Sequence, residues 1–316
     1  MLSFIARRLI FSAFVIVGVL SLVFVSMHLA PGDPIDMLIS PEGGGRAGPE
    51  VIEQLRRKYG LDQPLIVQYV DYLKNALRFD LGESIRNGRP VAREVLRLYP
   101  ATIQLTIASL LVAGLLGTVT GVLAALNKGK LLDQLSMTLA LLGVSLPHFL
   151  LGLLLMLVFS LQLGWLPPSG RAAGFGWDAI RHLVMPAATL GVATTAIISR
   201  LVRSSMLDVL KEDYVRTAAA KGVSRLWVVI RHAFRNSLIP LVTVLGLEFG
   251  VLLSGAVIAE SIFAWPGLGR YLILGINGRD FPVVQGAVIF IAITFVLVNL
   301  AVDILYSFLD PRVQYA

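Results

Sequence analysis

Long apolar runs dominate this chain of 316 residues and determine the solvent in which it can fold. Several of them exceed the roughly 18 apolar residues that mark a membrane-spanning helix. Hydrophobic residues make up 56% of the chain and charged residues only 15%, whereas about a quarter of a soluble domain is charged. The sequence therefore predicts an all-α, multi-pass membrane protein.

Prolines and short polar loops divide the apolar runs into six expected transmembrane helices. Pro100, Pro186 and Pro282 stand at expected helix starts, and Pro147 predicts a kink inside the third span. The first run is longer than the core of a cleaved signal peptide, so we expect a retained first span. The six spans are expected at about residues 9–29, 101–126, 135–163, 186–206, 239–263 and 282–308.

Small residues mark the helix faces that are expected to pack closely. Gly117 and Gly121 are four residues apart in the second span, which predicts close contact with another helix. Gly246, Gly250 and Ser254 repeat this spacing on one face of the fifth span.

The pattern predicts four consecutive parts. Residues 1–30 form the first transmembrane helix, and residues 31–99 form an extracytoplasmic lateral segment with short helices. Residues 100–309 form a five-helix core that includes a basic segment, residues 207–239, and residues 310–316 form a cytoplasmic tail. The 31–99 segment holds ten basic and ten acidic residues.

The distribution of Lys and Arg predicts the orientation of the chain. With the N-terminus inside, the inner segments carry thirteen basic residues, of which eight lie between Arg200 and Arg235. The short outer loops carry only Arg171, Arg181, Arg270 and Arg279. Both termini and the basic segment are therefore predicted to be cytoplasmic.

The sequence favours a chain without catalytic or nucleotide-binding chemistry of its own. It has no cysteine, and its four histidines lack metal-ligand spacing. Gly129 and Lys130 are followed by leucine and are not preceded by the glycine that a phosphate-binding loop needs. No residue set for proteolysis within the membrane has a suitable spacing.

Four polar residues within the apolar spans are candidates for the translocation path or its gating: Glu248, Glu260, Ser254 and His148. Carboxylates inside a membrane are functional candidates because their desolvation must be offset. Glu248 can line an aqueous path or pair with a polar group on a neighbouring helix. Glu260, near the outer end of its span, suits a structural or gating role, and His148 suits a hydrogen-bonded residue of the bundle.

The basic segment suits two helices separated by a tight turn. Residues 208–220 favour a helix that stops at Gly222, and Ser224 can cap a second helix over residues 225–237. The exposed basic side chains would be Lys221, Arg225, Arg231 and Arg235. Such a pair can rest on lipid headgroups, or it can act as a lever docked in the groove of a cytoplasmic partner.

The segment resembles the cytoplasmic "EAA" coupling loop of ABC importer permeases. Ala218 and Gly222 match the second alanine and the glycine of that motif, whereas Arg216 and Thr217 replace its first two residues. These departures are typical of the dipeptide/oligopeptide/nickel permease family, whose version reads Tyr-x-Arg-Thr-Ala-x-Ala-Lys-Gly.

Further stretches resemble the same family in order along nearly the whole chain, and they are similar to its B-type subunit. They are Leu29-Ala-Pro-Gly-Asp-Pro34, Gly60-Leu-Asp-Gln-Pro64, Asp80-Leu-Gly82, Gly164-Trp-Leu-Pro167, Ala264-Trp-Pro-Gly-Leu-Gly-Arg270, Arg279-Asp-Phe-Pro282 and Val302-Asp-Ile-Leu-Tyr306. The resemblance implies the type I ABC importer permease fold, with both termini inside, in a bacterial inner (plasma) membrane.

The resemblance also implies a function and partners. The partners would be a second related permease, two cytoplasmic ATPase subunits that bind ATP and Mg, and an extracytoplasmic substrate-binding protein. This chain would hold no cofactor and would not be an enzyme. Alternating access would be driven through the loop 207–239, and the coupling residues carried over are Arg216, Thr217, Ala218, Lys221 and Gly222.

The expected substrates are dipeptides and oligopeptides. Glutathione, a nickel chelate or an oligosaccharide remain alternatives with the same architecture, because specificity in such systems resides largely in the binding protein. An ATP-independent secondary transporter is a further alternative, although the sequence shows neither inverted repeats nor a chain of intramembrane charges.

Overall fold

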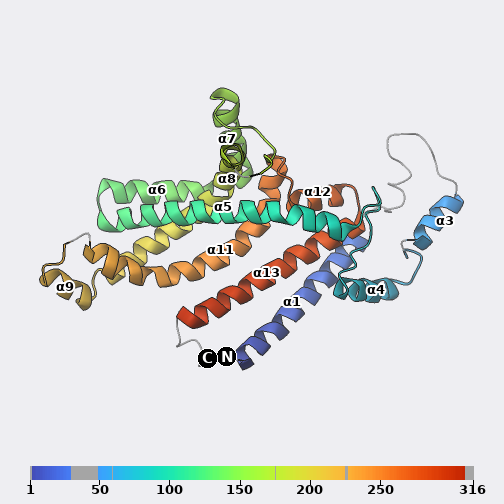
Figure 1. Ribbon diagram of the computed structural model, residues 1–316, viewed down its shortest axis with the longest axis horizontal. Helices are drawn as coiled ribbons and strands as arrows, with labels where there is room; N and C mark the ends of the chain where they lie inside the picture. Colours follow the sequence, from blue (N-terminus) through green and yellow to red (C-terminus); the bar gives the residue numbers. More distant parts are fainter. Residues whose placement is uncertain (1, 30–48, 59, 175, 225–226, 310–316) are drawn as a thin grey trace. The chain divides into compact units, whose positions relative to one another are not determined.

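The computed structural model describes residues 2–29, 49–58, 60–174, 176–224 and 227–309 (Figure 1). The expected helix break at residues 30–34 and the tail 310–316 lie outside these residues. The helices are α1 (Leu2–Leu29), α3 (Pro49–Lys58), α4 (Leu65–Leu77), α5 (Val91–Leu126), α6 (Leu131–Ser145), α7 (His148–Leu155), η1 (Met156–Gln162), α8 (Trp177–Val209), α9 (Asp213–Ala220), η2 (Val228–Phe234), α11 (Arg235–Ile262), α12 (Leu268–Asn277) and α13 (Phe281–Leu309). Of these, η1 and η2 are π-helical.

Five of the described helices are long and apolar enough to cross a membrane. The number rises to six if the bent pair α6 and α7–η1 is counted as one span. The apolar stretches are Arg7–Leu29 of α1, Val91–Leu126 of α5, Trp177–Val209 of α8, Pro240–Ile262 of α11 and Phe281–Val302 of α13. This confirms the prediction of a multi-pass, helical membrane protein.

Two prolines that were expected to start spans lie inside helices instead. Pro100 lies within α5 and Pro186 within α8, so both helices begin earlier than predicted. Val91 and Val95, which precede Pro100, are fully buried in a hydrophobic core. The free energy gained by burying these preceding residues outweighs the loss of the one backbone hydrogen bond that a proline removes.

The expected kink in the third span is a sharp break. The axes of α6 and α7 differ by 105° across Leu146 and Pro147. Leu146 adopts an extended conformation, with φ −83° and ψ 126°. Because the proline ring disfavours the helical conformation of the residue before it, this residue ends α6 rather than bending it.

The chain forms two compact units. The first unit comprises Met1–Ala101 and Pro266–Leu297. Its core contains Leu20 of α1, Val95 of α5, Leu268 of α12 and Ile289 of α13. Within it, α1 and the beginning of α13 lie side by side (Figure 1). The N-terminal hundred residues thus share a core with residues 266–297.

The second unit comprises Thr102–Trp265 and Val298–Ala316. Here α5 packs against α8 at the predicted glycine pair. A Cβ atom on Gly117 would lie 2.7 Å from Ile198 Cβ, and one on Gly121 would lie 2.7 Å from the carbonyl oxygen of Ser199. The predicted close contact at Gly117 and Gly121 is therefore confirmed.

The predicted small-residue face of α11 does not serve a single contact. A Cβ atom on Gly246 would lie 2.3 Å from Val302 Cγ2 of α13, which is an equally close approach. Ser254, two turns further along, is exposed. Of the residues with this spacing, Gly246 thus packs closely against α13, whereas Ser254 is exposed on the surface of the chain.

Candidate functional site

The basic segment contains a short surface helix, α9, which follows α8 after a brief turn. Its buried side chains are Val215 and Ala218, which form a small cluster with Val228 of η2. Val209 and Leu210 at the end of α8 pack against this cluster. The apolar positions at i and i+3 therefore seat α9 on the end of α8.

The helix boundaries in this segment differ from those predicted. Residues 208–220 do not form one helix, because α8 continues to Val209 and α9 begins at Asp213. The second predicted helix is the π-helical η2, which runs directly into α11. Tyr214 of α9 accepts a hydrogen bond from Asn236 Nδ2 at 2.7 Å, so α9 is also tied to the beginning of α11.

The coupling residues carried over from the resemblance lie on two sides of α9. Arg216, Thr217 and Lys221 are exposed. Ala218 is 8% exposed and faces the cluster with Val215. The outward face of α9 thus presents charged and hydroxyl side chains, among which Arg216 lies 3.7 Å from the exposed Asp213. Ala218 instead helps to seat the helix on α8.

Gly222 provides the turn after α9. Its φ of +81° lies in the left-handed region, and the space around a Cβ there is open. The N–H of Val223 donates to the Ala218 carbonyl at 3.3 Å, and the N–H of Lys221 donates to the Thr217 carbonyl at 3.1 Å. This is the pattern of a glycine-terminated helix, as predicted from the sequence.

The basic side chains after this turn are described only in part. Arg231 of η2 is exposed, as expected from the sequence. Arg225 and the side chain of Arg235 lie outside the described part of the chain.

Glu260 is the most deeply buried of the candidate path residues. It is 0% exposed, near the end of α11. Thr102 Oγ1 of α5 donates a hydrogen bond to Glu260 Oε1 at 2.6 Å. A carboxylate that is buried in this way needs such hydrogen-bond donors. The hydrogen bond also holds α5 at Thr102 against α11.

Glu248 and His148 both contact α8. Thr194 Oγ1 donates to Glu248 Oε2 at 2.8 Å, and Glu248 is half-buried. His148 Nδ1 lies 3.2 Å from the carbonyl oxygen of Thr189, at the first residue of α7. The sequence left two interpretations of Glu248 open, and its geometry has a feature of each, because it has a polar partner and an exposed portion.

Replacing Glu260 with alanine is expected to destabilise the protein more than the same change at Glu248. Removing a buried charged acceptor costs about 1.5–3 kcal/mol and leaves the Thr102 hydroxyl without this acceptor. The half-buried Glu248 can be replaced at lower cost because less of its side chain is enclosed by the protein. Thermal unfolding of the two purified variants measures the difference, and a larger shift for Glu248→Ala contradicts this reading of burial.

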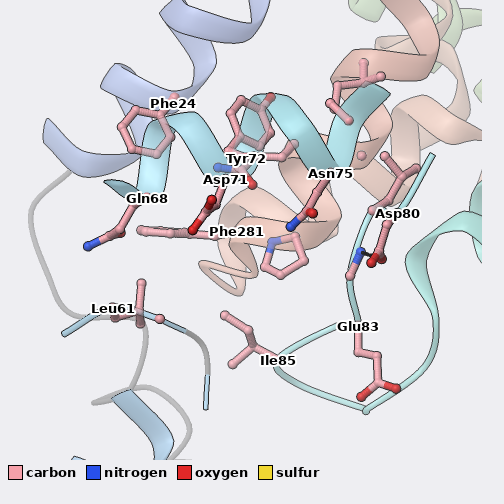
Figure 2. A pocket seen from close by; sticks show the side chains of 18 of the residues that line it. Phe24, Leu61, Gln68, Asp71, Tyr72, Asn75, Asp80, Glu83, Ile85 and Phe281 are labelled. Carbon is pink, nitrogen blue, oxygen red and sulfur yellow. Dashed lines mark hydrogen bonds between the residues drawn. The ribbon is translucent and has the colours of Figure 1, made fainter. Parts of the chain in front are cut away.

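A cavity in the first unit was not predicted from the sequence. It has a volume of about 570 Å³ and is lined by residues of α1, α4, the loop before α5 and the beginning of α13 (Figure 2). Figure 2 shows Phe24, Tyr72 and Phe281 on one side and the polar side chains of Asp71 and Asn75 among them. Because these segments are far apart in the sequence, no local pattern indicates the cavity.

The cavity has an aromatic wall. The Phe24 and Tyr72 rings are stacked with centroids 5.8 Å apart, and the centroids of His28 and Phe281 are 5.7 Å apart. Among the described residues, the buried Tyr72 hydroxyl has no hydrogen-bond partner. Burial raises the pKa of Tyr72 above its usual range, and the neighbouring Tyr69 adds to the shift. The hydroxyl is therefore protonated at neutral pH.

Both parts of the chain match profiles of one transport family. The profile described as "Binding-protein-dependent transport system inner membrane component" matches residues 117–315. The profile of the corresponding N-terminal region matches residues 1–106. The chain therefore belongs to the binding-protein-dependent transport system inner membrane components, and it is a multi-pass permease subunit of a bacterial inner membrane.

Characterised relatives and a solved structure agree with this assignment. The glutathione transport system permease protein GsiC of Escherichia coli (strain K12) is 44% identical over 315 residues, which cover 100% of both chains. The di/tripeptide transport system permease protein DppB of Pseudomonas aeruginosa (strain UCBPP-PA14) is 45% identical over 337 residues, covering 100% of this chain and 99% of the relative. A chain of the MetNI methionine ABC transporter in an inward-facing conformation is similar in fold, with a TM-score of 0.58 and 18% identity over 70% of this chain and 98% of that chain.

Proposed function

We propose that this permease subunit imports short peptides and is driven by ATP hydrolysis on partner subunits through α9 and the turn at Gly222. The observation that carries the proposal is the geometry of α9. Its inner face is buried on α8, whereas Arg216, Thr217 and Lys221 remain exposed on the predicted cytoplasmic side. A helix that is fixed on one side and presents charged and hydroxyl side chains on the other suits a lever gripped by another protein.

The proposed assembly contains this chain, a second related permease, two cytoplasmic ATPase subunits and an extracytoplasmic binding protein. ATP and Mg are bound by the ATPase subunits, and this chain carries no cofactor. Closure of the ATPase pair pushes α9, and the two permeases alternate between inward-facing and outward-facing states. The absence of a phosphate-binding loop in the sequence supports this division of labour.

Peptides of two or three residues are the proposed substrates. The two relatives described above transport di/tripeptides and glutathione, which is itself a small peptide. The identities of 45% and 44% do not distinguish di/tripeptides from glutathione as the substrate. The proposed substrate is therefore the class of short peptides.

One face of α11 suits the proposed contact with the second permease or the path between them. From Leu247 onward its exposed positions follow helical spacing, and Ser254 lies in the middle of them. They are Leu247, Val251, Ser254, Ile258 and Ser261. Glu248 and His148 are proposed to modulate the path through their contacts with α8, and Glu260 is proposed to hold the outer end of α11.

The proposal is tested by expressing this chain with and without its candidate partners. We expect it to co-purify with two ATPase subunits and a second permease, and the binding protein to capture labelled di- or tripeptides. Competition of glutathione and of longer peptides with the labelled peptide then defines which class of peptide the binding protein captures. Capture of a nickel chelate or an oligosaccharide, with no peptide binding, contradicts the proposed substrate and leaves the assembly proposal in place.

A further inference from the structure

The beginning of α6 is tied to α8 by an ion pair whose carboxylate is buried. Arg203 Nε donates to Asp133 Oδ1 at 2.6 Å, and Arg203 Nη2 donates to Asp133 Oδ2 at 2.8 Å. The backbone N–H of Gly129 donates to the same carboxylate at 2.9 Å. The Asp133 side chain is 6% exposed and that of Arg203 is 26% exposed. Such a two-pronged pair fixes direction as well as distance.

Arg203 lies on the part of α8 that carries α9. Met206 follows one turn later and is buried in a cluster with Val229 of η2. Val209 ends α8 and packs against the α9 cluster described above. From Arg203 to Val209 the helix rises only about 9 Å. The ion pair therefore holds α8 close to the end on which α9 is packed.

A second contact holds α6 to α8 further along. A Cβ atom on Gly143 would lie 2.9 Å from Val192 Cγ1, which shows that the two helices approach closely there. Just beyond lies the sharp break at Leu146 and Pro147, after which α7 begins. If α6 moves together with α8, the end of α6 at this break moves as well.

We propose that Asp133 and Arg203 are positioning residues that make α6 and α8 move as one body when α9 is pushed. The inference rests on the proposed coupling role of α9. A bidentate pair with a buried carboxylate resists sliding of one helix past the other, because each displacement breaks hydrogen bonds to that carboxylate. The Arg57–Glu53 pair of α3, at 2.6 Å with side chains 69% and 65% exposed, contributes little and serves as a comparison outside the coupling loop.

The test compares Asp133→Asn with the control Glu53→Gln in the complete transporter in proteoliposomes. The measured quantity is the ATP hydrolysed per labelled tripeptide imported, at a known amount of assembled complex. We expect Asp133→Asn to raise this ratio about fivefold or more, as loss of a typical coupling between sites would. Glu53→Gln is expected to leave it unchanged. A merely structural role would lower ATP hydrolysis and import together, at a constant ratio.

Arg203→Lys decides the question if Asp133→Asn does not assemble. Lysine keeps the charge and loses the forked geometry, so we expect an assembled complex with an intermediate ratio. The double variant Asp133→Asn with Arg203→Gln is expected to be no worse than the single variants, because they remove the same interaction. Wild-type ratios for the assembled variants overturn the ion-pair proposal alone, whereas wild-type import that is independent of ATP overturns the proposed function.

Discussion

Replacing Gly222 with valine is expected to uncouple the complex, so that import falls by up to about tenfold while ATP hydrolysis continues. The φ of +81° at Gly222 costs a residue with a side chain about 1–2 kcal/mol, and a β-branched residue tolerates it least. This cost lowers the equilibrium constant for forming the native turn by roughly tenfold. Because the space around Gly222 is open, the effect is one of backbone conformation and not of a clash.

Two control variants isolate the role of this turn. Gly222→Asn is expected to keep most of the import, because asparagine visits the left-handed region more readily than other residues. Gly174→Val imposes the same kind of strain at φ +79°, also in open space, in the loop before α8. If Gly174→Val uncouples the complex as strongly as Gly222→Val, the effect does not depend on α9 and this explanation of the turn is wrong.

Replacing Gly121 with alanine is expected to prevent normal assembly of the second unit. The added Cβ would lie 2.7 Å from the Ser199 carbonyl oxygen and 2.8 Å from Val202 Cβ. Neither the backbone nor a β-branched carbon can move aside cheaply, so α5 and α8 must separate. Overpacking of this kind costs about 1–3 kcal/mol. The unfolding temperature and the yield of purified protein measure the effect.

Gly114→Ala is the matched control for Gly121→Ala on the same helix. A Cβ at Gly114 would lie 3.5 Å from Leu245 Cδ2, which is an ordinary contact. Alanine also favours the helix by about 1 kcal/mol over glycine, so this variant is expected to be as stable as the wild type or more so. Equal losses for Gly114→Ala and Gly121→Ala would contradict this explanation, because helix propensity favours both changes and only Gly121 lies at the close approach of α5 to α8.

Apolar periodicity and length were sufficient to predict the class of fold and the location of its spans. Prolines were less informative about where helices begin. Pro100 and Pro186 are expected helix starts, yet the residues before them are helical. Before Pro100, the burial of Val91 and Val95 offsets the one missing hydrogen bond. Pro147 ended its helix because Leu146 took an extended conformation. A proline therefore allows a helix to begin, continue or end near it, and the conformation and packing of the neighbouring residues decide which of these occurs.

The candidate sites were predicted to a similar extent. The glycine stop at Gly222 follows from residue type, since few other residues adopt its backbone conformation. The burial of Ala218 against α8 does not follow from the motif, because it depends on how α9 is seated. The pairing of Asp133 with Arg203, seventy residues apart, and the aromatic cavity near Tyr72 had no local signal at all.

The most direct test of the central claim is the import of a labelled tripeptide into proteoliposomes that contain the complete set of proposed subunits. The account predicts import only when the binding protein, both ATPase subunits, ATP and Mg are present together. Omission of the ATPase subunits serves as the decisive comparison. Import by this chain and the second permease alone, without ATP, would contradict the account and favour a secondary transporter.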